Sequence, residues 1–344
     1  MQAPGSRRLG AAALGTRVAV YLVPLGPALL LAACDGQQSA LQPSGPGARD
    51  AAVLWWAMLA GSVIIFALVL ALLLYAVLRP PERRRHVPVE RMIVAGGFVL
   101  PVVALSILLP FGLNMGASTY AELPTDALTV RVEGRQWWWK IEYLENGSTQ
   151  SFTTANEIYL PVGEPVEILL SSADVIHSFW VPRLAGKQDL IPGRTNRLVV
   201  EAEEPGAFRG QCAEFCGLAH TQMALYVVAV PPEDFRDWAE RQRAPAELPR
   251  TEAETQGAAA FASRGCALCH AIRGHGAWAQ LGPDLTHVGS RRTIGAGLVA
   301  NTPENVATWI AHSQEMKPGN QMPPFTHLDA GTRQAIAAYL GSLK

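Results

Sequence analysis

One short segment of this chain concentrates side chains that bind soft metal ions. In "GQCAEFCGLAHTQM", Cys212 and Cys216 are followed by His220 and Met223. A disulfide between the two cysteines would leave the histidine and the methionine without a role, and methionine is a poor ligand for zinc. Thiolate, imidazole and thioether together are ligands of copper. Because two thiolates can bridge two metal ions, the segment favours a dinuclear copper centre.

A copper centre of this kind needs a second histidine from elsewhere in the chain. "SSADVIHSFWVP" places His177 after a predicted strand, well before Cys212 in the sequence. The two residues can meet only when a β domain folds and brings their strands together. His177 is therefore the expected second imidazole ligand.

A second group of reactive residues lies in the C-terminal part. "RGCALCHAI" contains Cys266, Cys269 and His270 in a C-x-x-C-H arrangement. This motif attaches a c-type haem: the thiols add to the vinyl groups and the histidine becomes the proximal iron ligand. A thioredoxin-like redox pair would need a βαβ context, which this region lacks. We therefore predict covalently bound haem c.

Two long apolar runs dominate the N-terminal half. Residues 51–78 contain no charged side chain, and residues 92–115 form the second run. Each is long enough to cross a hydrocarbon core of about 30 Å and lacks the polar face of a soluble helix. The connecting segment "RPPERRRHVPVER" is rich in arginine, and positive loops stay in the cytoplasm. We predict a transmembrane hairpin over residues 51–118, with the chain after Tyr120 exported.

The N-terminus has the features of an export signal. Three arginines precede an apolar stretch that ends in "LLLAAC", which predicts a signal peptide over residues 1–33. The ending resembles a bacterial lipoprotein cleavage box, which would leave Cys34 as a lipidated first residue. Ordinary cleavage nearby and an uncleaved third anchor are the alternatives. Residues 34–50 are rich in Pro, Gly and Ser and are predicted to be a linker.

The exported part divides into a β domain and an α domain. Segments such as "LTVRVEG", "QWWWKIEYL" and "MALYVVAV" have strand character, which predicts an all-β sandwich or barrel over residues 119–232. On a strand, Trp137 and Trp139 would share one face. Residues 233–252 are expected to form a helix and a linker. Residues 253–344 have helical signals, including Thr302 as an expected N-cap.

The segments that contain the copper-ligand candidates closely resemble subunit II of haem–copper cytochrome c oxidases. The matching segments are "DVIHSFWVPRLAGKQDLIPGR" and "GQCAEFCGLAHTQM", and the resemblance extends over residues 51–232. It implies a cupredoxin-like barrel that holds the dinuclear CuA centre. The implied ligands are His177, Cys212, Cys216, His220, Met223 and the backbone carbonyl of Glu214. Quinol-oxidising relatives lack these ligands, so the resemblance implies oxidation of a cytochrome.

The same resemblance implies roles for three further residues. Trp137 corresponds to the family's first tryptophan of an aromatic stretch, which passes electrons to CuA; ordinary core packing is the alternative. The carboxylate of Glu214 would bind Mg²⁺ at the contact with subunit I. Glu90 lies where the family has a carboxylate at the entrance of a proton path, although its spacing to Pro101 does not match that pattern.

The C-terminal region resembles an all-α class I cytochrome c domain. In "LGPDL", the carbonyl of Pro283 would accept a hydrogen bond from the proximal histidine. In "KPGNQMPPF", Met322 is the implied sixth ligand of the haem iron, with Met316 as its competitor. A Met/His ligand pair raises the potential of the haem, as a donor to copper requires.

Together these resemblances imply an oxidase subunit II with a fused cytochrome c domain. Electrons would pass from a cytochrome c, or from a quinol–cytochrome c reductase, to the haem, then to CuA, and then to haem a in subunit I. That subunit, with other oxidase subunits, would reduce oxygen and pump protons. The expected location is the bacterial inner membrane, with the N-terminus and both C-terminal domains on the periplasmic side.

Other functions fit the sequence less well. The formal net charge of −1 gives no indication of nucleic-acid binding. Nitrous oxide reductase has a CuA domain but no membrane hairpin, and it carries a large histidine-rich domain that this sequence lacks. A CuA-type nitric oxide reductase remains the alternative, because its catalytic subunit is a separate chain.

Overall fold

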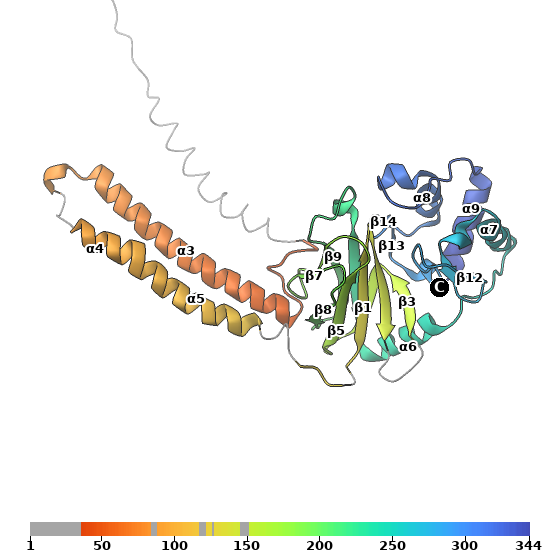
Figure 1. The fold of residues 1–344 in the computed structure, drawn as a ribbon, viewed down its shortest axis with the longest axis horizontal. Helices are drawn as coiled ribbons and strands as arrows, with labels where there is room; N and C mark the ends of the chain where they lie inside the picture. Colours follow the sequence, from red (N-terminus) through yellow and green to blue (C-terminus); the bar gives the residue numbers. More distant parts are fainter. Residues whose placement is uncertain (1–35, 84–87, 117–121, 126, 145–150) are drawn as a thin grey trace, which may run out of the picture.

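The computed structural model describes residues 36–83, 88–116, 122–125, 127–144 and 151–344. The predicted signal peptide and Cys34 lie outside the described residues. A pair of long helices stands beside a β domain, and a smaller helical domain lies on the opposite side of that β domain (Figure 1).

The apolar runs form two long helices. The first is α3 (Pro46–Leu78), followed by a short turn, η1 (Pro81–Arg83). The second is a continuous helix made of α4 (Val89–Val94), the π-helical turn η2 (Ala95–Val99) and α5 (Leu100–Gly116). Both are long and apolar enough to cross a membrane, and their apolar windows have no buried residues. Apolar side chains all round a helix are stable only when lipid or protein covers them, so lipid is the natural surrounding of this pair.

The chain before α3 is anchored to the β domain. Pro46 occupies the first helical turn, so the helix begins within the predicted linker. The Ser44 backbone N–H donates to the Arg183 carbonyl at 2.7 Å. Gly45 passes so close to the β domain that a Cβ atom there would lie 2.3 Å from the Glu201 carbonyl oxygen. These contacts hold the outer end of α3 against the domain that follows the hairpin.

The β domain consists of two five-stranded sheets that face each other. Their strand orders are β3-β2-β1-β5-β8 and β4-β10-β9-β6-β7. Most neighbours are antiparallel, whereas β1 with β5 and β4 with β10 are parallel. The strands are β1 (Thr129–Arg135), β2 (Trp138–Leu144), β3 (Phe152–Ala155), β4 (Glu157–Pro161), β5 (Val166–Ser172), β6 (His177–Trp180), β7 (Gln188–Leu190), β8 (Asn196–Val200), β9 (Gly206–Cys212) and β10 (Ala224–Val230).

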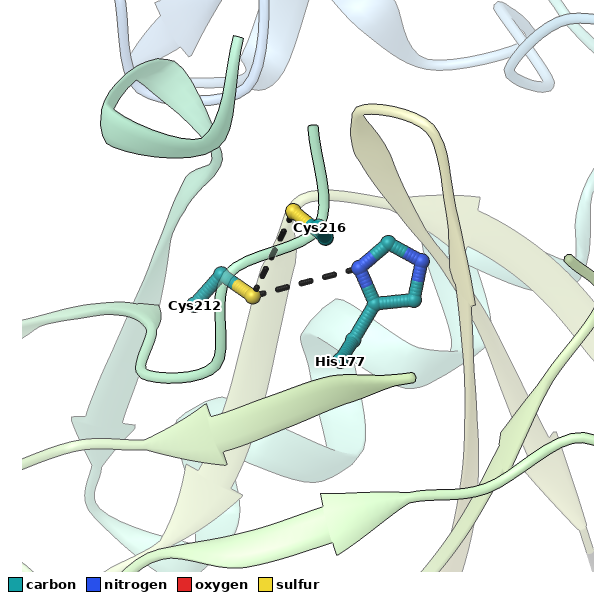
Figure 2. A group of neighbouring side chains, drawn as sticks. All are labelled: His177, Cys212 and Cys216. Carbon is teal, nitrogen blue, oxygen red and sulfur yellow. Dashed lines mark hydrogen bonds between the residues drawn. The ribbon is translucent and has the colours of Figure 1, made fainter. Parts of the chain in front are cut away.

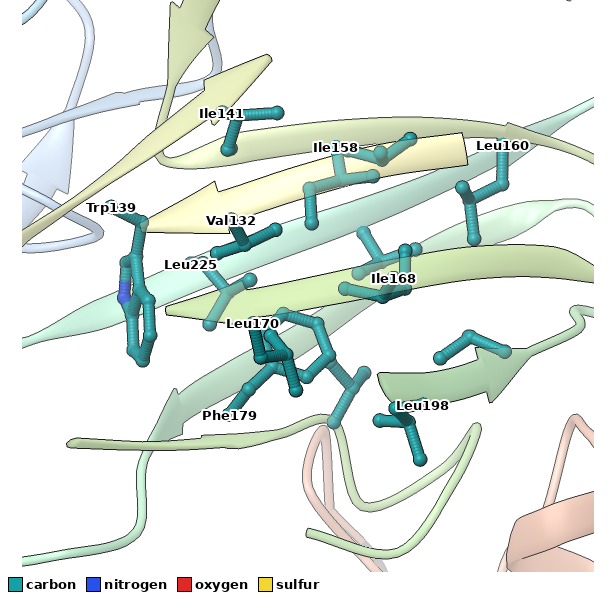
Figure 3. Close-up of a cluster of buried hydrophobic side chains, with 14 of the residues drawn as sticks. Val132, Trp139, Ile141, Ile158, Leu160, Ile168, Leu170, Phe179, Leu198 and Leu225 are labelled. Carbon is teal, nitrogen blue, oxygen red and sulfur yellow. The ribbon is translucent and has the colours of Figure 1, made fainter. Parts of the chain in front are cut away.

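The core of this domain follows from the period-two pattern of its strands. On β1, Val130 and Val132 are fully buried, and on β2, Trp139 and Ile141 are fully buried. These side chains and their counterparts on the second sheet fill the space between the sheets (Figure 3). Such interdigitating inner faces make a rigid scaffold. The expectation that Trp137 shares the face of Trp139 on a strand is wrong, because Trp137 lies in the turn between β1 and β2.

The C-terminal domain is helical around a small core. Helix α6 (Pro232–Arg243) leads from the β domain to α7 (Glu252–Ser263), α8 (Pro303–Met316) and α9 (Ala330–Ser342). Two short 3-10 turns, η5 (Cys266–Leu268) and η6 (Val288–Ser290), and the two-residue strands β11 (Ala271–Ile272), β12 (Ala277–Trp278), β13 (Thr293–Ile294) and β14 (Val299–Ala300) connect them.

Local sequence determines where these helices begin and how closely they pack. Thr302 caps α8 as predicted, since its side chain accepts a hydrogen bond from the Asn305 N–H. Thr251 and Glu254 form a capping box at the start of α7. Gly257 lets α7 approach α9, because a Cβ atom at this position would lie 2.0 Å from the Ala335 carbonyl oxygen. The helical frame around the C-x-x-C-H motif is therefore tightly packed.

Candidate metal and haem centres

The folded β domain brings His177 to the cysteine loop. His177 opens β6 and Cys212 ends β9, and the two strands are antiparallel neighbours. The imidazole Nδ1 lies 3.9 Å from the Cys212 Sγ, which lies 3.8 Å from the Cys216 Sγ (Figure 2). All three side chains are buried, and their ligand atoms lie within 4.8 Å of one another. Both cysteines are free, so the structure has no disulfide in this loop.

The remaining ligand candidates of the loop surround Cys216. The His220 Nδ1 lies 3.5 Å and the Met223 Sδ lies 3.9 Å from the Cys216 Sγ. The backbone carbonyl of Glu214 lies 3.2 Å from the Cys212 Sγ. A hydrogen bond of 2.9 Å from the Cys212 N–H to the Met223 carbonyl closes the loop at its base. All six predicted donor groups therefore lie close together around the loop that joins β9 to β10.

The two cysteine thiols change each other's pKa. Hydrogen bonding between them is the largest cause that lowers the pKa of Cys212 to about 3 and raises the pKa of Cys216. Cys212 is therefore the more readily ionised of the two thiols, and a bound metal would displace the proton of the other. Two sulfurs, two imidazole nitrogens, a thioether and a carbonyl fit copper by their softness, whereas a magnesium or calcium site would need oxygen ligands.

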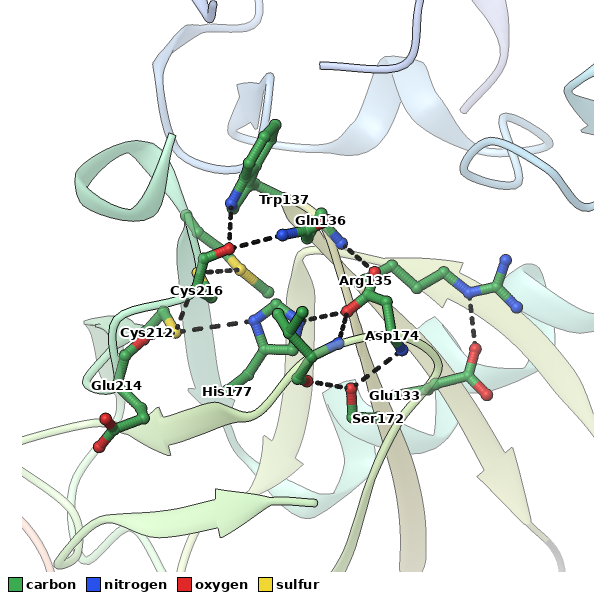
Figure 4. Close-up of polar contacts among 12 residues, drawn as sticks. Glu133, Arg135, Gln136, Trp137, Ser172, Asp174, His177, Cys212, Glu214 and Cys216 are labelled. Carbon is green, nitrogen blue, oxygen red and sulfur yellow. Dashed lines mark hydrogen bonds and ion pairs between the residues drawn. The ribbon is translucent and has the colours of Figure 1, made fainter. Parts of the chain in front are cut away.

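Two residues that the sequence analysis did not identify hold His177 in place. The Nε2 atom of His177 lies 2.8 Å from the Asp174 carboxylate, which leaves Nδ1 facing the sulfurs (Figure 4). Such a carboxylate partner orients a metal-binding histidine and fixes its tautomer. A Cβ atom at Gly134 would lie 2.7 Å from the His177 ring, so only glycine leaves room for the imidazole beside β1. The D-x-x-H spacing of Asp174 and His177 is a sequence signal that could have identified Asp174.

Trp137 joins the cysteine loop to the C-terminal domain. Its indole Nε1–H donates to the Cys216 carbonyl at 3.0 Å, and the Gln136 side chain donates to the same oxygen at 2.7 Å (Figure 4). The Trp137 side chain is buried. The outer edge of its ring meets the C-terminal domain at Gly319, where a Cβ atom would lie 3.2 Å from Cη2. The indole therefore spans from the sulfur-rich loop to the other domain.

Two acidic residues implied by the family resemblance lie away from these ligands. The carboxylate of Glu214 points away from the sulfurs, and Glu214 is exposed (Figure 4). Within the described residues, the one group of three or more His, Cys, Asp or Glu side chains whose ligand atoms converge is His177, Cys212 and Cys216, and Glu214 is not part of it. Glu90 lies in the first turn of α4 and is exposed.

The C-x-x-C-H motif lies on η5 and the turn after it. The His270 Nδ1 lies 2.8 Å from the Pro283 carbonyl, which is the predicted hydrogen bond. Burial lowers the pKa of His270, so the neutral imidazole needed for iron binding is favoured. A Cβ atom at Gly282 would lie 2.6 Å from the imidazole Cε1, so this position must be glycine. Cys266 and Cys269 are both free thiols in the structure.

The two methionine candidates have different surroundings. Met322 packs against the hydrophobic cluster of the C-terminal domain, together with Cys266 and Leu285. Its carbonyl accepts hydrogen bonds from Ser313 Oγ at 3.0 Å and from Gln314 Nε2 at 2.8 Å. Met316 instead ends α8 at the contact between the domains. Met322 therefore packs against the same hydrophobic cluster as Cys266, one of the predicted haem-attachment cysteines.

Comparison with known families gives matches to both exported domains. The family described as "Cytochrome C oxidase subunit II, periplasmic domain" matches residues 142–230. The family described as "Cytochrome c" matches residues 254–344. The former implies a CuA copper centre and the latter a c-type haem, and the donor atoms described above fit both.

Several relatives and a solved structure are named as subunit II of a cytochrome oxidase. Cytochrome c oxidase subunit 2 of Alkalihalophilus pseudofirmus is 35% identical over 330 residues, which cover 92% of this chain and 94% of the relative. Cytochrome c oxidase subunit 2 of Bacillus subtilis is 30% identical over 229 residues, covering 64% of this chain and 63% of the relative. The periplasmic domain of subunit II of cytochrome oxidase (CoxB) of Bradyrhizobium japonicum is 32% identical and has a TM-score of 0.33. That match covers 36% of this chain and 97% of the solved chain.

Proposed function

Because the chain belongs to the cytochrome c oxidase subunit II family and ends in a cytochrome c domain, we propose that it is the electron-entry subunit of its oxidase. Electrons pass from the haem domain to the copper loop and then to haem a in subunit I. Oxygen is reduced to water on that other subunit, with coupled proton pumping. The oxidoreductase activity therefore belongs to the assembled complex.

The observation that carries this proposal is the position of Trp137 between the cysteine loop and the C-terminal domain. On one side its indole donates to the carbonyl of Cys216, a copper-ligand candidate. On the other side it meets Gly319, in the loop that leads to Met322. A packed aromatic side chain between two redox domains gives a continuous path through protein atoms.

The residues of this chain would hold the donor atoms of both centres rigidly, orient them and exclude water from them. A dinuclear copper centre and a c-type haem each take up and release one electron. We assign His177, Cys212, Cys216, His220, Met223 and the Glu214 carbonyl to the copper. Asp174 orients His177, and the buried sheets around them keep the donor atoms fixed, so that little rearrangement accompanies a change of charge. Cys266, Cys269, His270 and Met322 hold the haem, with Pro283 as the hydrogen-bond partner of the proximal histidine.

The surroundings of the subunit follow from the same assignment. Two candidate membrane helices and a periplasmic-type domain support a membrane-anchored subunit. We place it in the bacterial inner membrane beside subunit I and the other oxidase subunits, with both redox domains outside. A cytochrome c or a quinol–cytochrome c reductase supplies the electrons. Lipidation of Cys34, a Mg²⁺ on Glu214 and a role of Glu90 in proton uptake are further parts of this proposal.

The alternative function as a subunit of a CuA-type nitric oxide reductase has less support. The relatives reported above are named as subunits of cytochrome c oxidase. The geometry of the two centres would serve either enzyme, because the oxygen- or nitric oxide-reducing site is on another chain.

The order of reduction tests the proposed function. We expect the full-length protein in detergent, matured with haem and copper, to contain a dinuclear copper centre and a single c-type haem. After rapid mixing with a reduced c-type cytochrome, the haem should be reduced first and the copper afterwards. Absorption and paramagnetic resonance spectra would follow both steps. A zinc-filled or empty cysteine loop, or copper that is reduced before the haem, would contradict the proposal.

Replacing Trp137 by phenylalanine should slow the electron transfer from haem to copper. Phenylalanine keeps an aromatic ring but loses the Nε1–H bond to the Cys216 carbonyl and the outer half of the indole. We expect a decrease of roughly tenfold, which corresponds to about 1.4 kcal/mol of barrier. The matched control is Trp138→Phe, because Trp138 is half-buried beside Arg135 and lies on β2 rather than in the turn that meets the cysteine loop. Equal rates in both variants would exclude Trp137 from the path.

A further inference from the structure

The contact between the two redox domains contains a buried lysine. Lys317 follows α8, and only 2% of its surface is exposed. Its Nζ donates to the backbone carbonyls of Trp137 at 2.7 Å, Gln222 at 2.8 Å and Gly295 at 2.8 Å. The first two acceptors belong to the cupredoxin-like domain and the third belongs to the haem domain. One side chain thus joins three segments that are far apart in the sequence.

This arrangement satisfies the full bonding capacity of the lysine. An ammonium group has three N–H donors and no acceptor, and here each donor has a carbonyl oxygen at hydrogen-bond distance. Burial lowers the pKa of Lys317 to about 7, whereas the three carbonyl acceptors favour the charged form. A buried cation is tolerated only where such partners are fixed in advance. The site is therefore specific for a lysine held in this position.

The partners of Lys317 adjoin both redox centres. Trp137 contacts the copper loop through its indole, and Gln222 directly precedes Met223, a copper-ligand candidate. Lys317 itself begins the loop that leads to Met322. Neighbouring bonds cross the same boundary: the Gln222 side chain donates to the Met316 carbonyl at 3.0 Å, and the Ala224 N–H donates to the Ala296 carbonyl at 3.0 Å.

We propose that Lys317 is a positioning residue that fixes the haem domain on the cupredoxin-like domain and thereby sets the path from the haem through Trp137. Its effect on electron transfer rests on the proposed function, whereas its effect on docking does not. The lysine acts through the backbone of Trp137 and Gln222, and it contacts neither predicted cofactor. In the docked arrangement Trp137 is covered, so an external donor must deliver its electron to the haem domain.

The test compares Lys317→Met with the wild-type full-length protein in detergent. Methionine retains most of the apolar length but leaves three buried carbonyls without a donor. Because an unsatisfied buried group weakens an interface, we expect amide hydrogen exchange at Ala224 to rise by roughly tenfold or more. We expect the haem-to-copper transfer rate to fall by about the same factor. The absorption spectrum of the haem and the resonance spectrum of the copper should stay unchanged. If Lys317 only supported the local structure of either centre, its replacement would change these spectra.

Two further variants make the test decisive. Lys187→Met removes an exposed lysine of the cupredoxin-like domain and should change neither measurement. Lys317→Gln keeps two N–H donors and should give an intermediate effect. It replaces Lys317→Met in the experiment if the methionine variant does not fold. Unchanged exchange in the folded Lys317 variants would overturn the proposal, and so would raised exchange with an unchanged transfer rate. If the wild type itself passes no electron to copper while the exchange still responds to Lys317, the proposed function fails and the docking role stands.

Discussion

Cys216→Ser is expected to abolish the copper centre and, with it, electron transfer out of the haem domain. Cys216 is central to the ligand group: its Sγ lies 3.8 Å from the Cys212 Sγ, 3.5 Å from the His220 Nδ1 and 3.9 Å from the Met223 Sδ. Serine offers a hydroxyl that neither bridges two soft ions nor ionises near neutral pH. Loss of this shared ligand should therefore affect both metal positions at once.

A second, milder variant gives a lower bound for the loss of copper affinity in Cys216→Ser. Changes to residues that only support a ligand typically cost about 10–100-fold in metal affinity, and we expect Asp174→Asn to fall in this range. Cys216→Ser should exceed it. Copper per chain, measured by elemental analysis, and the paramagnetic resonance spectrum would report the loss. The haem absorbance serves as an internal control, since Cys266, Cys269 and His270 are unaffected. A retained dinuclear spectrum in Cys216→Ser would refute the assignment of this residue as a bridge.

Met322→Leu is expected to lower the reduction potential of the haem and so to stop the transfer of electrons to copper. Axial ligands set haem potentials over a range of about 0.8 V, and a methionine ligand raises the potential. Leucine fills the same volume in the cluster with Cys266 and Leu285 but has no sulfur. For a one-electron carrier, each fall of about 59 mV changes the transfer equilibrium tenfold.

Met316→Leu is the matched control for this experiment. Both methionines lie in one short stretch of sequence, but Met316 lies at the domain contact, where its backbone carbonyl accepts a hydrogen bond from Gln222. Leucine leaves that carbonyl in place, so the potential should remain at the wild-type value. A redox titration followed by haem absorbance would measure both variants. If Met316→Leu lowered the potential and Met322→Leu did not, the two assignments would have to be exchanged.

The sequence determined the parts of this protein that depend on local spacing. The C-x-x-C-H motif, the loop from Cys212 to Met223 and the two apolar runs each lie within one short segment. Their chemistry therefore follows from residue type and separation alone. The cap at Thr302 and the strands of the core are local in the same sense, since they depend on hydrogen bonds or side-chain alternation between near neighbours.

Only the tertiary structure decided which distant residues act together. His177 meets Cys212 because β6 and β9 are neighbours, and Asp174 and Gly134 became visible as its supports only in that geometry. Trp137 was expected on a strand face, whereas the turn after β1 directs it between the two domains. No motif or pattern in the sequence indicated a role for Lys317. Its role arises from three carbonyls on separate segments, and such long-range convergence is set by packing of the whole chain, which no local pattern encodes.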